Sequence, residues 1–153
     1  MVEQLPLPGF QLREDKPLLH LETAMDLLGR TEDDVVRLCE SGELSHCWDI
    51  ASAGATRREI RIWRRSFLAY WHGTRPQYET DDAVVALVIG HGRPAITGPE
   101  AQRILSCGQW LVRDLAKSKV LAALNEPTTG PNGALRICAN SFRRFLLSRL
   151  NRL

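Results

Sequence analysis

The chain has 153 residues, of which 44% are hydrophobic and 25% charged, and these proportions are typical of a folded globular protein rather than a disordered one. No apolar run approaches the roughly 20 residues of a membrane-crossing helix, and the N-terminus lacks a secretory signal, so we expect a cytoplasmic protein. The net charge of +2 is unevenly shared. Residues 1–75 hold 10 Lys and Arg against 12 Asp and Glu, whereas residues 76–153 hold 10 against 6, so the second half is better suited to a polyanion.

The first predicted elements are two short helices joined by a tight turn. Leu21, Ala24 and Leu28 lie at helical spacing, and Gly29 interrupts the pattern. Thr31 can cap the second helix, with Asp34 three residues on, and this helix is expected to end at Gly42. Its buried stripe is formed by Val35, Leu38 and Cys39.

A β-hairpin and a third helix are predicted next. Residues 45–50 and 58–63 are short β-prone runs on either side of a loop of small residues. The third helix begins near Ser66 and turns Phe67, Tyr70 and Trp71 inward. Residues 83–89 then form an apolar run between capping residues and Gly90, which favours a short helix although its β-branched residues also suit a strand. Because this segment is hydrophobic on every side, we expect it to be buried, within the chain rather than in a dimer contact.

The second half of the chain repeats the first. Adding 77 to the numbers of six residues of the first copy gives residues of matching character, namely Leu27, Leu28, Val35, Leu38, Ser41 and Leu44 against Ile104, Leu105, Val112, Leu115, Ser118 and Leu121. Residues 61–67 realign with residues 136–142 at an offset of 75. The second copy has a capping box at Thr97 and Glu100, a predicted hairpin at residues 120–124 and 134–137, and an amphipathic C-terminal helix from Ser141. A repeat of this length is too long for a solenoid unit, so each copy should be a small globular domain.

The order helix, turn, helix, hairpin and helix describes a winged helix-turn-helix. We therefore predict a mainly α fold with small β-hairpin wings, of class α+β. The division is an N-terminal extension (1–18), a first module (19–75), a linker with a short apolar helix (76–94) and a second module (95–153).

The residues that carry both copies resemble a known family. The run of residues 27–29, 35–38 and 41–44, followed by Arg61, Ile62 and Ser66, is similar to the excisionase and MerR-type winged helix-turn-helix of phage and bacterial DNA-binding proteins. The likeness covers residues 19–71 and again 96–147. It implies that the second helix of a module enters the major groove of double-stranded DNA and that the wing meets the DNA backbone. It also implies a transcription regulator, an excisionase-like recombination or architectural factor, or a phage packaging component.

The second module carries the better candidates for DNA contact. Gln109 can pair with adenine, Arg113 can address guanine or phosphate, and Trp110 suits either a thymine methyl or sugar contact or the protein core. Lys117 and Lys119 lie at the end of the same helix, and Asn132 and Arg136 lie in the second wing.

The first module is less suited to DNA. Glu32, Asp33 and Asp34 begin its second helix, where they would repel phosphate or meet a basic protein partner, although they also favour the helix dipole. Its densest basic cluster, on the first hairpin and the start of the third helix, contains Arg57, Arg58, Arg61, Arg64 and Arg65. Alternation along the strand places Arg61 on the face opposite Arg58, so the wing tip is the expected phosphate contact, and the alternative is a solvated, salt-bridged strand edge.

The remaining motifs argue against catalysis and cofactors. His46 lies near Cys39 and Cys47, but no pair of ligands has zinc-finger spacing, and the four cysteines are expected to be reduced and buried. Phosphate-binding-loop, nucleophile-elbow and zinc-protease patterns are absent from the sequence. We expect a DNA-binding protein that is not an enzyme, has no metal or cofactor and is monomeric or homodimeric. The alternative is a protein-interaction adaptor built on degenerate winged-helix modules.

Overall fold

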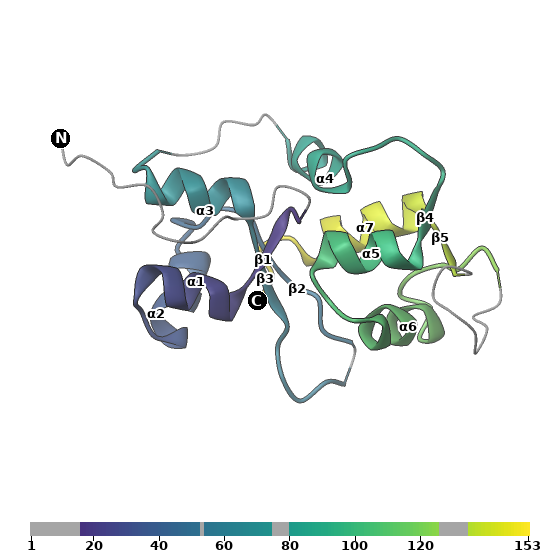
Figure 1. Ribbon diagram of the computed structural model, residues 1–153, viewed down its shortest axis with the longest axis horizontal. Coiled ribbons are helices and arrows are strands. Elements are labelled where there is room, and N and C mark those ends of the chain that lie inside the picture. Colours follow the sequence, from purple (N-terminus) through teal and green to yellow (C-terminus); the bar gives the residue numbers. More distant parts are fainter. Residues whose placement is uncertain (1–15, 53, 75–79, 126–134) are drawn as a thin grey trace.

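The computed structural model describes residues 16–52, 54–74, 80–125 and 135–153. The described part is a mixed chain of short helices and small antiparallel sheets, which is compatible with the α+β class (Figure 1). In chain order its elements are β1 (Leu18–His20), α1 (Leu21–Leu28), α2 (Glu32–Glu40), β2 (Cys47–Asp49), β3 (Ile60–Trp63), α3 (Arg64–Trp71), α4 (Asp81–Ile89), β4 (Ala95–Thr97), α5 (Gly98–Leu105), α6 (Gln109–Lys117), β5 (Arg136–Cys138) and α7 (Ala139–Arg149).

The order of elements repeats along the chain. β1, α1 and α2 of the first unit (residues 17–71) recur as β4, α5 and α6 of the second unit (residues 94–149), with both ends of each element displaced by 77 residues. The C-terminal ends of β3 and β5, Trp63 and Cys138, are displaced by 75 residues. The third helix of each unit begins with an equivalent hydrogen bond. The Arg64 amide donates to the Pro17 carbonyl at 2.7 Å, and the Ala139 amide donates to the Pro94 carbonyl at 3.0 Å. The duplication seen in the sequence is therefore present in the backbone.

The helix starts confirm the capping predictions. The Thr31 Oγ1 accepts a hydrogen bond from the Asp34 amide at 3.3 Å, and the Thr97 Oγ1 accepts one from the Glu100 amide at 3.2 Å. A third cap, at Thr80, starts α4 in the same way. Each cap satisfies an amide that has no partner within its own helix.

The first helix of each unit ends in a left-handed residue, but the two residues differ. Gly29 follows α1 with φ 63°, which glycine adopts at little cost, whereas Ser106 follows α5 with φ 50°. A side chain in this region is disfavoured by about 1 kcal/mol. The Ser106 Oγ donates to the Leu18 carbonyl at 2.6 Å, so a contact with the first unit supports the strained residue.

The sheet of the first unit lies between the two halves of the molecule and is covered on both faces (Figure 1). Its strand order is β1-β3-β2, and all strands are antiparallel. One face carries Leu19, Ile60 and Ile62, which belong to the core of the first unit. The other carries Leu18, Trp48 and Trp63, which join the core of the second unit. The central strand β3 is therefore buried on both faces, so the alternative of a solvated strand edge does not describe it.

Arg61 is the main correction to the sequence-based site. Its side chain lies on the face that meets the second unit and is only 3% exposed, so it is not available to DNA in this structure. The Arg61 Nε donates to the Leu105 carbonyl at 2.8 Å, and the Nη2 donates to the Ser106 carbonyl at 3.0 Å. The alternation in the sequence could not reveal that the end of α5 lies opposite Arg61.

The C-terminal segment also joins the units. The Trp48 Nε1 donates to the Leu146 carbonyl at 2.9 Å, and Trp48 forms an isolated β-bridge with Leu150. The Arg149 Nη1 donates to the carbonyls of Asp49 and Ala51, both at 2.9 Å. These bonds and the shared core make the two units one packed body within the described residues.

The predicted hairpins are formed to different extents. β2 and β3 confirm the first hairpin. In the second unit, β5 pairs with β4, and residues 120–124 contribute an isolated bridge between Ala123 and Ile137 instead of a named strand. Asn132 and the predicted turn around it lie outside the described residues. The strands β1 and β4 were not predicted, because three residues are too few to show alternation.

The apolar segment between the units is a helix, as predicted, but it is not buried on every side. Val84, Val85, Val88 and Ile89 of α4 are buried in the core of the second unit, and α4 packs against α7. Leu87 is 41% exposed on the opposite side. No helix in the described residues has the length and apolar character needed to span a membrane.

Acid should destabilise the fold through His46. This ring is partly buried against Trp63, at 5.2 Å between ring centroids, and burial lowers its pKa below 6.5 despite the opposing effect of Asp81. The unfolded chain therefore binds the proton more readily. The unfolded chain has the ordinary His46 pKa of 6.5, and the folded chain has a lower one. The stability that depends on a neutral His46 is therefore fully present above pH 6.5 and is lost as the pH falls from 6.5 through the pKa of the folded state.

Urea unfolding at a series of pH values tests this expectation. His46→Gln should show a weaker dependence of the unfolding free energy on pH than the native chain. His72→Gln, an exchange at an exposed site after α3, controls for the loss of a histidine. Equal pH dependence in the native chain and His46→Gln would exclude this role for His46.

Candidate nucleic-acid interface

α6 presents its candidate DNA-contacting side chains on one face. At about 100° per residue, Gln109, Trp110, Arg113 and Lys117 fall within a sector of roughly 100°. Val112, Leu115 and Ala116 are buried, with Leu115 opposite this sector and Ala116 at its edge next to Gln109. Gln109 and Lys117 are exposed, and Arg113 is partly buried and has a local interaction. The helix thus has the division into a packed and an open face that groove entry requires.

Trp110 has the most informative position on α6. Its side chain is 70% exposed at the second residue of the helix, so it does not belong to the core. The sequence left core packing and surface contact equally open for this residue. Large exposed aromatic side chains are uncommon on monomeric surfaces and are enriched at binding sites.

Two further predicted residues extend the basic surface of the second unit. Lys119 is exposed in the turn after α6, with φ 61°, and lines a surface hollow with Lys117 and residues 121–125. Arg136 is exposed on β5, and its amide donates to the Asn125 Oδ1 at 2.8 Å. The structure therefore brings Lys117 and Lys119 together and leaves the Arg136 side chain accessible beside the segment that follows them.

The corresponding helix of the first unit has the opposite charge. At the offset of 77 residues, Asp33 replaces Trp110 and Glu40 replaces Lys117. Glu32 and Asp33 are exposed, and Asp34 lies 3.9 Å from the Arg37 guanidinium, which is itself 77% exposed. The equivalent of Arg113 is Val36, which is buried. The two helices share a backbone but present different surfaces.

The wing arginines of the first unit lie among carboxylates. Arg57 and Arg58 are exposed in the loop between β2 and β3, which extends downwards between α2 and α6 in the view of Figure 1. They line a pocket together with Glu22, Glu32 and Glu59. Nearby carboxylates reduce the positive potential that a phosphate would meet, so this loop is a weaker candidate than α6.

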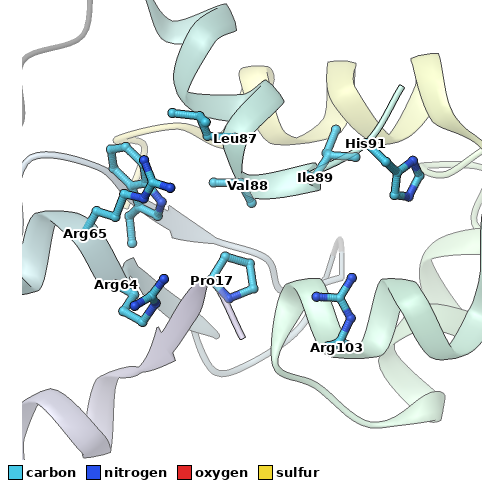
Figure 2. A pocket seen from close by; sticks show the side chains of 10 residues that line it. Pro17, Arg64, Arg65, Leu87, Val88, Ile89, His91 and Arg103 are labelled. Atoms are coloured by element: carbon cyan, nitrogen blue, oxygen red, sulfur yellow. The ribbon is translucent and has the colours of Figure 1, made fainter. Parts of the chain in front are cut away.

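A second basic feature was missed from the sequence. Arg64 and Arg65 at the start of α3 and Arg103 of α5 line one pocket between the units (Figure 2). Arg64 and Arg65 belong to the basic cluster visible in the sequence, but Arg103 lies in the other repeat. Only the packing of the two units brings these residues together, so no local pattern could indicate the pocket.

Next to this pocket, Glu100 is the centre of a polar cluster. The His91 Nε2 and the Arg93 Nη2 both contact the Glu100 Oε2 at 2.8 Å. Burial acts to raise the pKa of Glu100, but the hydrogen bonds from His91 and Thr97 and the charge of Arg93 outweigh it and lower the pKa below 4.5. Glu100 therefore carries its negative charge at neutral pH and orders the chain between α4 and β4.

The cysteines lack the grouping of a metal site in the described residues. No three His, Cys, Asp or Glu side chains gather there closely enough to hold a metal ion. All four cysteines are free, with Cys39 and Cys47 buried and Cys107 and Cys138 partly buried. A hydrogen bond with Cys39 and burial raise the pKa of Cys47, and burial raises the pKa of Cys107 to about 11. These two thiols are protonated at neutral pH and are poor nucleophiles.

The site thus consists of one polar, basic helix face on the second unit, an acidic counterpart on the first, and a separate basic pocket between them. Comparison of the chain with protein-family models, with curated proteins and with solved structures finds no match.

Proposed function

We propose that the chain binds double-stranded DNA through the second of two tandem winged helix-turn-helix units, with α6 as the helix that enters the major groove. Gln109 and Arg113 would read base edges, and Lys117, Lys119 and Arg136 would neutralise phosphates. In this proposal α5 crosses the DNA backbone. The biological role would be transcription regulation or excisionase-like recombination.

The observation that carries the proposal is the open face of α6. Trp110 is 70% exposed beside Gln109 and Lys117, while the apolar residues of the same helix are buried. A tryptophan that is mostly in water contributes little packing to the fold, so its position is best explained by a partner that covers it. The basic side chains on the same face favour a polyanionic partner.

The two units have different roles in this proposal. Like charges would oppose each other if α2 approached a phosphate surface, because Glu32, Asp33 and Glu40 occupy the positions that serve DNA in α6. The first unit instead holds the second in place through Arg61 and the shared sheet face. The acidic surface of α2 stays away from the duplex or meets a basic protein.

A salt series tests the proposal directly. We expect the intact chain to bind a fluorescently labelled random duplex, and the logarithm of the association constant to fall with the logarithm of salt concentration with a slope of about −2 to −4. This range corresponds to two to four neutralised phosphates. No binding at low salt, or a slope near zero, would reject DNA as the partner.

A second candidate function is a protein-interaction adaptor. The specific observation in its favour is the first turn of α2, where Glu32 and Asp33 are exposed and unsuited to nucleic acid. A basic protein surface would complement them. If the duplex fails to bind at low salt while a polylysine peptide does bind, and Glu32→Lys with Asp33→Lys removes that binding, the adaptor is the better description.

A further inference from the structure

A compact basic pocket lies between the two units, apart from the exposed face of α6. It has a volume of about 230 Å³, and its wall includes Pro17, the start of α3, the end of α4 and Arg103. Figure 2 shows Arg64 and Arg65 on one side of the pocket and Arg103 and His91 on another. Among the described residues that line it, none is Asp or Glu.

Arg64 is the residue that suggests a ligand. Its Nε is buried and has no hydrogen-bond partner among the described residues. A buried donor without an acceptor costs about 1–3 kcal/mol, and more for a charged group, so native structures rarely leave one unpaired. An acceptor in the pocket would satisfy this nitrogen. Since a guanidinium presents its donors in a fork, an oxyanion with several acceptor oxygens suits it best.

The other polar groups of the wall define the charge of the ligand. The His91 ring is already engaged, because its Nε2 contacts Glu100 at 2.8 Å and its Nδ1 accepts from the Arg93 amide at 3.2 Å. His91 therefore lines the pocket, but both of its ring nitrogens are already engaged within the protein. The start of α3 and the end of α4 both border the pocket, and their helix dipoles oppose each other. The positive charge of the pocket comes from the arginine side chains.

We propose that this pocket is a binding site for a phosphate group. The volume is below the roughly 300–1,000 Å³ of typical small-molecule sites, so it fits a phosphate group rather than a large metabolite. Three guanidinium groups with no carboxylate among the described wall residues match an oxyanion in charge, and the Arg64 Nε supplies a buried donor for one of its oxygens. The phosphate belongs either to a free small anion or to the DNA backbone, and the site is independent of the interface proposed on α6.

The test uses the full chain and inorganic phosphate. ¹⁵N-labelled protein is titrated with sodium phosphate and, in parallel, with sodium chloride at the same ionic strength and pH. We expect saturable shifts confined to the amides around Arg64, Arg65 and Arg103, together with the Arg64 Nε–H signal. Arg64→Ala should weaken phosphate binding by about tenfold or more, because it removes a charged, partly buried donor group. Arg37→Ala, which removes an exposed arginine of α2, should leave binding unchanged.

A DNA arm distinguishes the source of the phosphate. If Arg64→Ala also weakens duplex binding and reduces the salt slope by about one, the pocket receives a backbone phosphate. If duplex binding is unchanged while the binding of free phosphate is abolished, the ligand is a separate anion. Shifts that do not saturate, that spread over the whole surface, or that match those produced by chloride would overturn the proposal. The native-chain titration decides the question even if Arg64→Ala does not fold.

Discussion

Replacing Arg61 with alanine is expected to lower the free energy of unfolding by about 3–5 kcal/mol. The guanidinium is almost fully buried and donates to the carbonyls of Ile60, Leu105 and Ser106. Truncation leaves these acceptors without their donor and opens a cavity between β3 and the end of α5. It also removes the bond that holds the Ser106 carbonyl in a strained turn. Urea unfolding followed by both circular dichroism and tryptophan fluorescence measures the destabilisation.

The duplication supplies a matched control for this experiment. Arg136 lies 75 residues after Arg61 on the equivalent strand but is exposed. Arg136→Ala should change stability by no more than about 0.5 kcal/mol, as is usual for surface sites. In a DNA-binding assay the order of the two effects should be reversed. Under conditions where Arg61→Ala is still folded, Arg136→Ala should weaken DNA binding more than Arg61→Ala does. Similar decreases of stability in the two variants would show that Arg61 does not fasten the units together.

Charge reversal on α6 should have the largest effect on DNA binding. In Arg113→Glu combined with Lys117→Glu, we expect affinity for duplex DNA to fall by about a hundredfold or more, because two attractive interactions become repulsive. The salt slope should become shallower by about one, because Lys117 is the residue of this pair that is assigned to a phosphate. Fluorescence anisotropy over a salt series gives both quantities.

The control for this variant lies on the other unit. Arg37→Glu on α2 produces the same change in charge per residue at an exposed position. It should change DNA affinity by less than about threefold if α2 stays away from the duplex. If Arg37→Glu weakens binding as strongly per charge as the α6 variant, both units face DNA and the proposed division of roles is wrong.

Local patterns were sufficient to predict the helices and much of the first hairpin. The spacing of Leu21, Ala24 and Leu28 and the caps at Thr31 and Thr97 depend on neighbours within a few residues, so the sequence records them. β1 and β4 differ, because each has three residues and becomes a strand only by pairing with β3 or β5. Their existence depends on tertiary contact and not on alternation.

The candidate site was predictable where it depends on one helix and not where it depends on two units. The spacing of Gln109, Arg113 and Lys117 places them on one face of α6 whatever surrounds the helix. Arg61 and Trp110 could not be assigned in this way. One is an arginine enclosed by distant carbonyls, and the other is a tryptophan left in solvent. Both positions reverse the usual preference of their residue type and are set by how the repeats pack.

The shared sheet face has a consequence for assembly. A head-to-tail junction between two copies of one fold can in principle be extended by further molecules, giving rings or filaments. In the first unit that junction rests on Leu18, Trp48 and Trp63. The strand pairing places Ala95, Leu124 and Cys138 at the corresponding sites of the second unit, and this set has no tryptophan and less apolar surface to offer. The second unit is therefore an end cap, and we expect the array to stop at two units rather than polymerise.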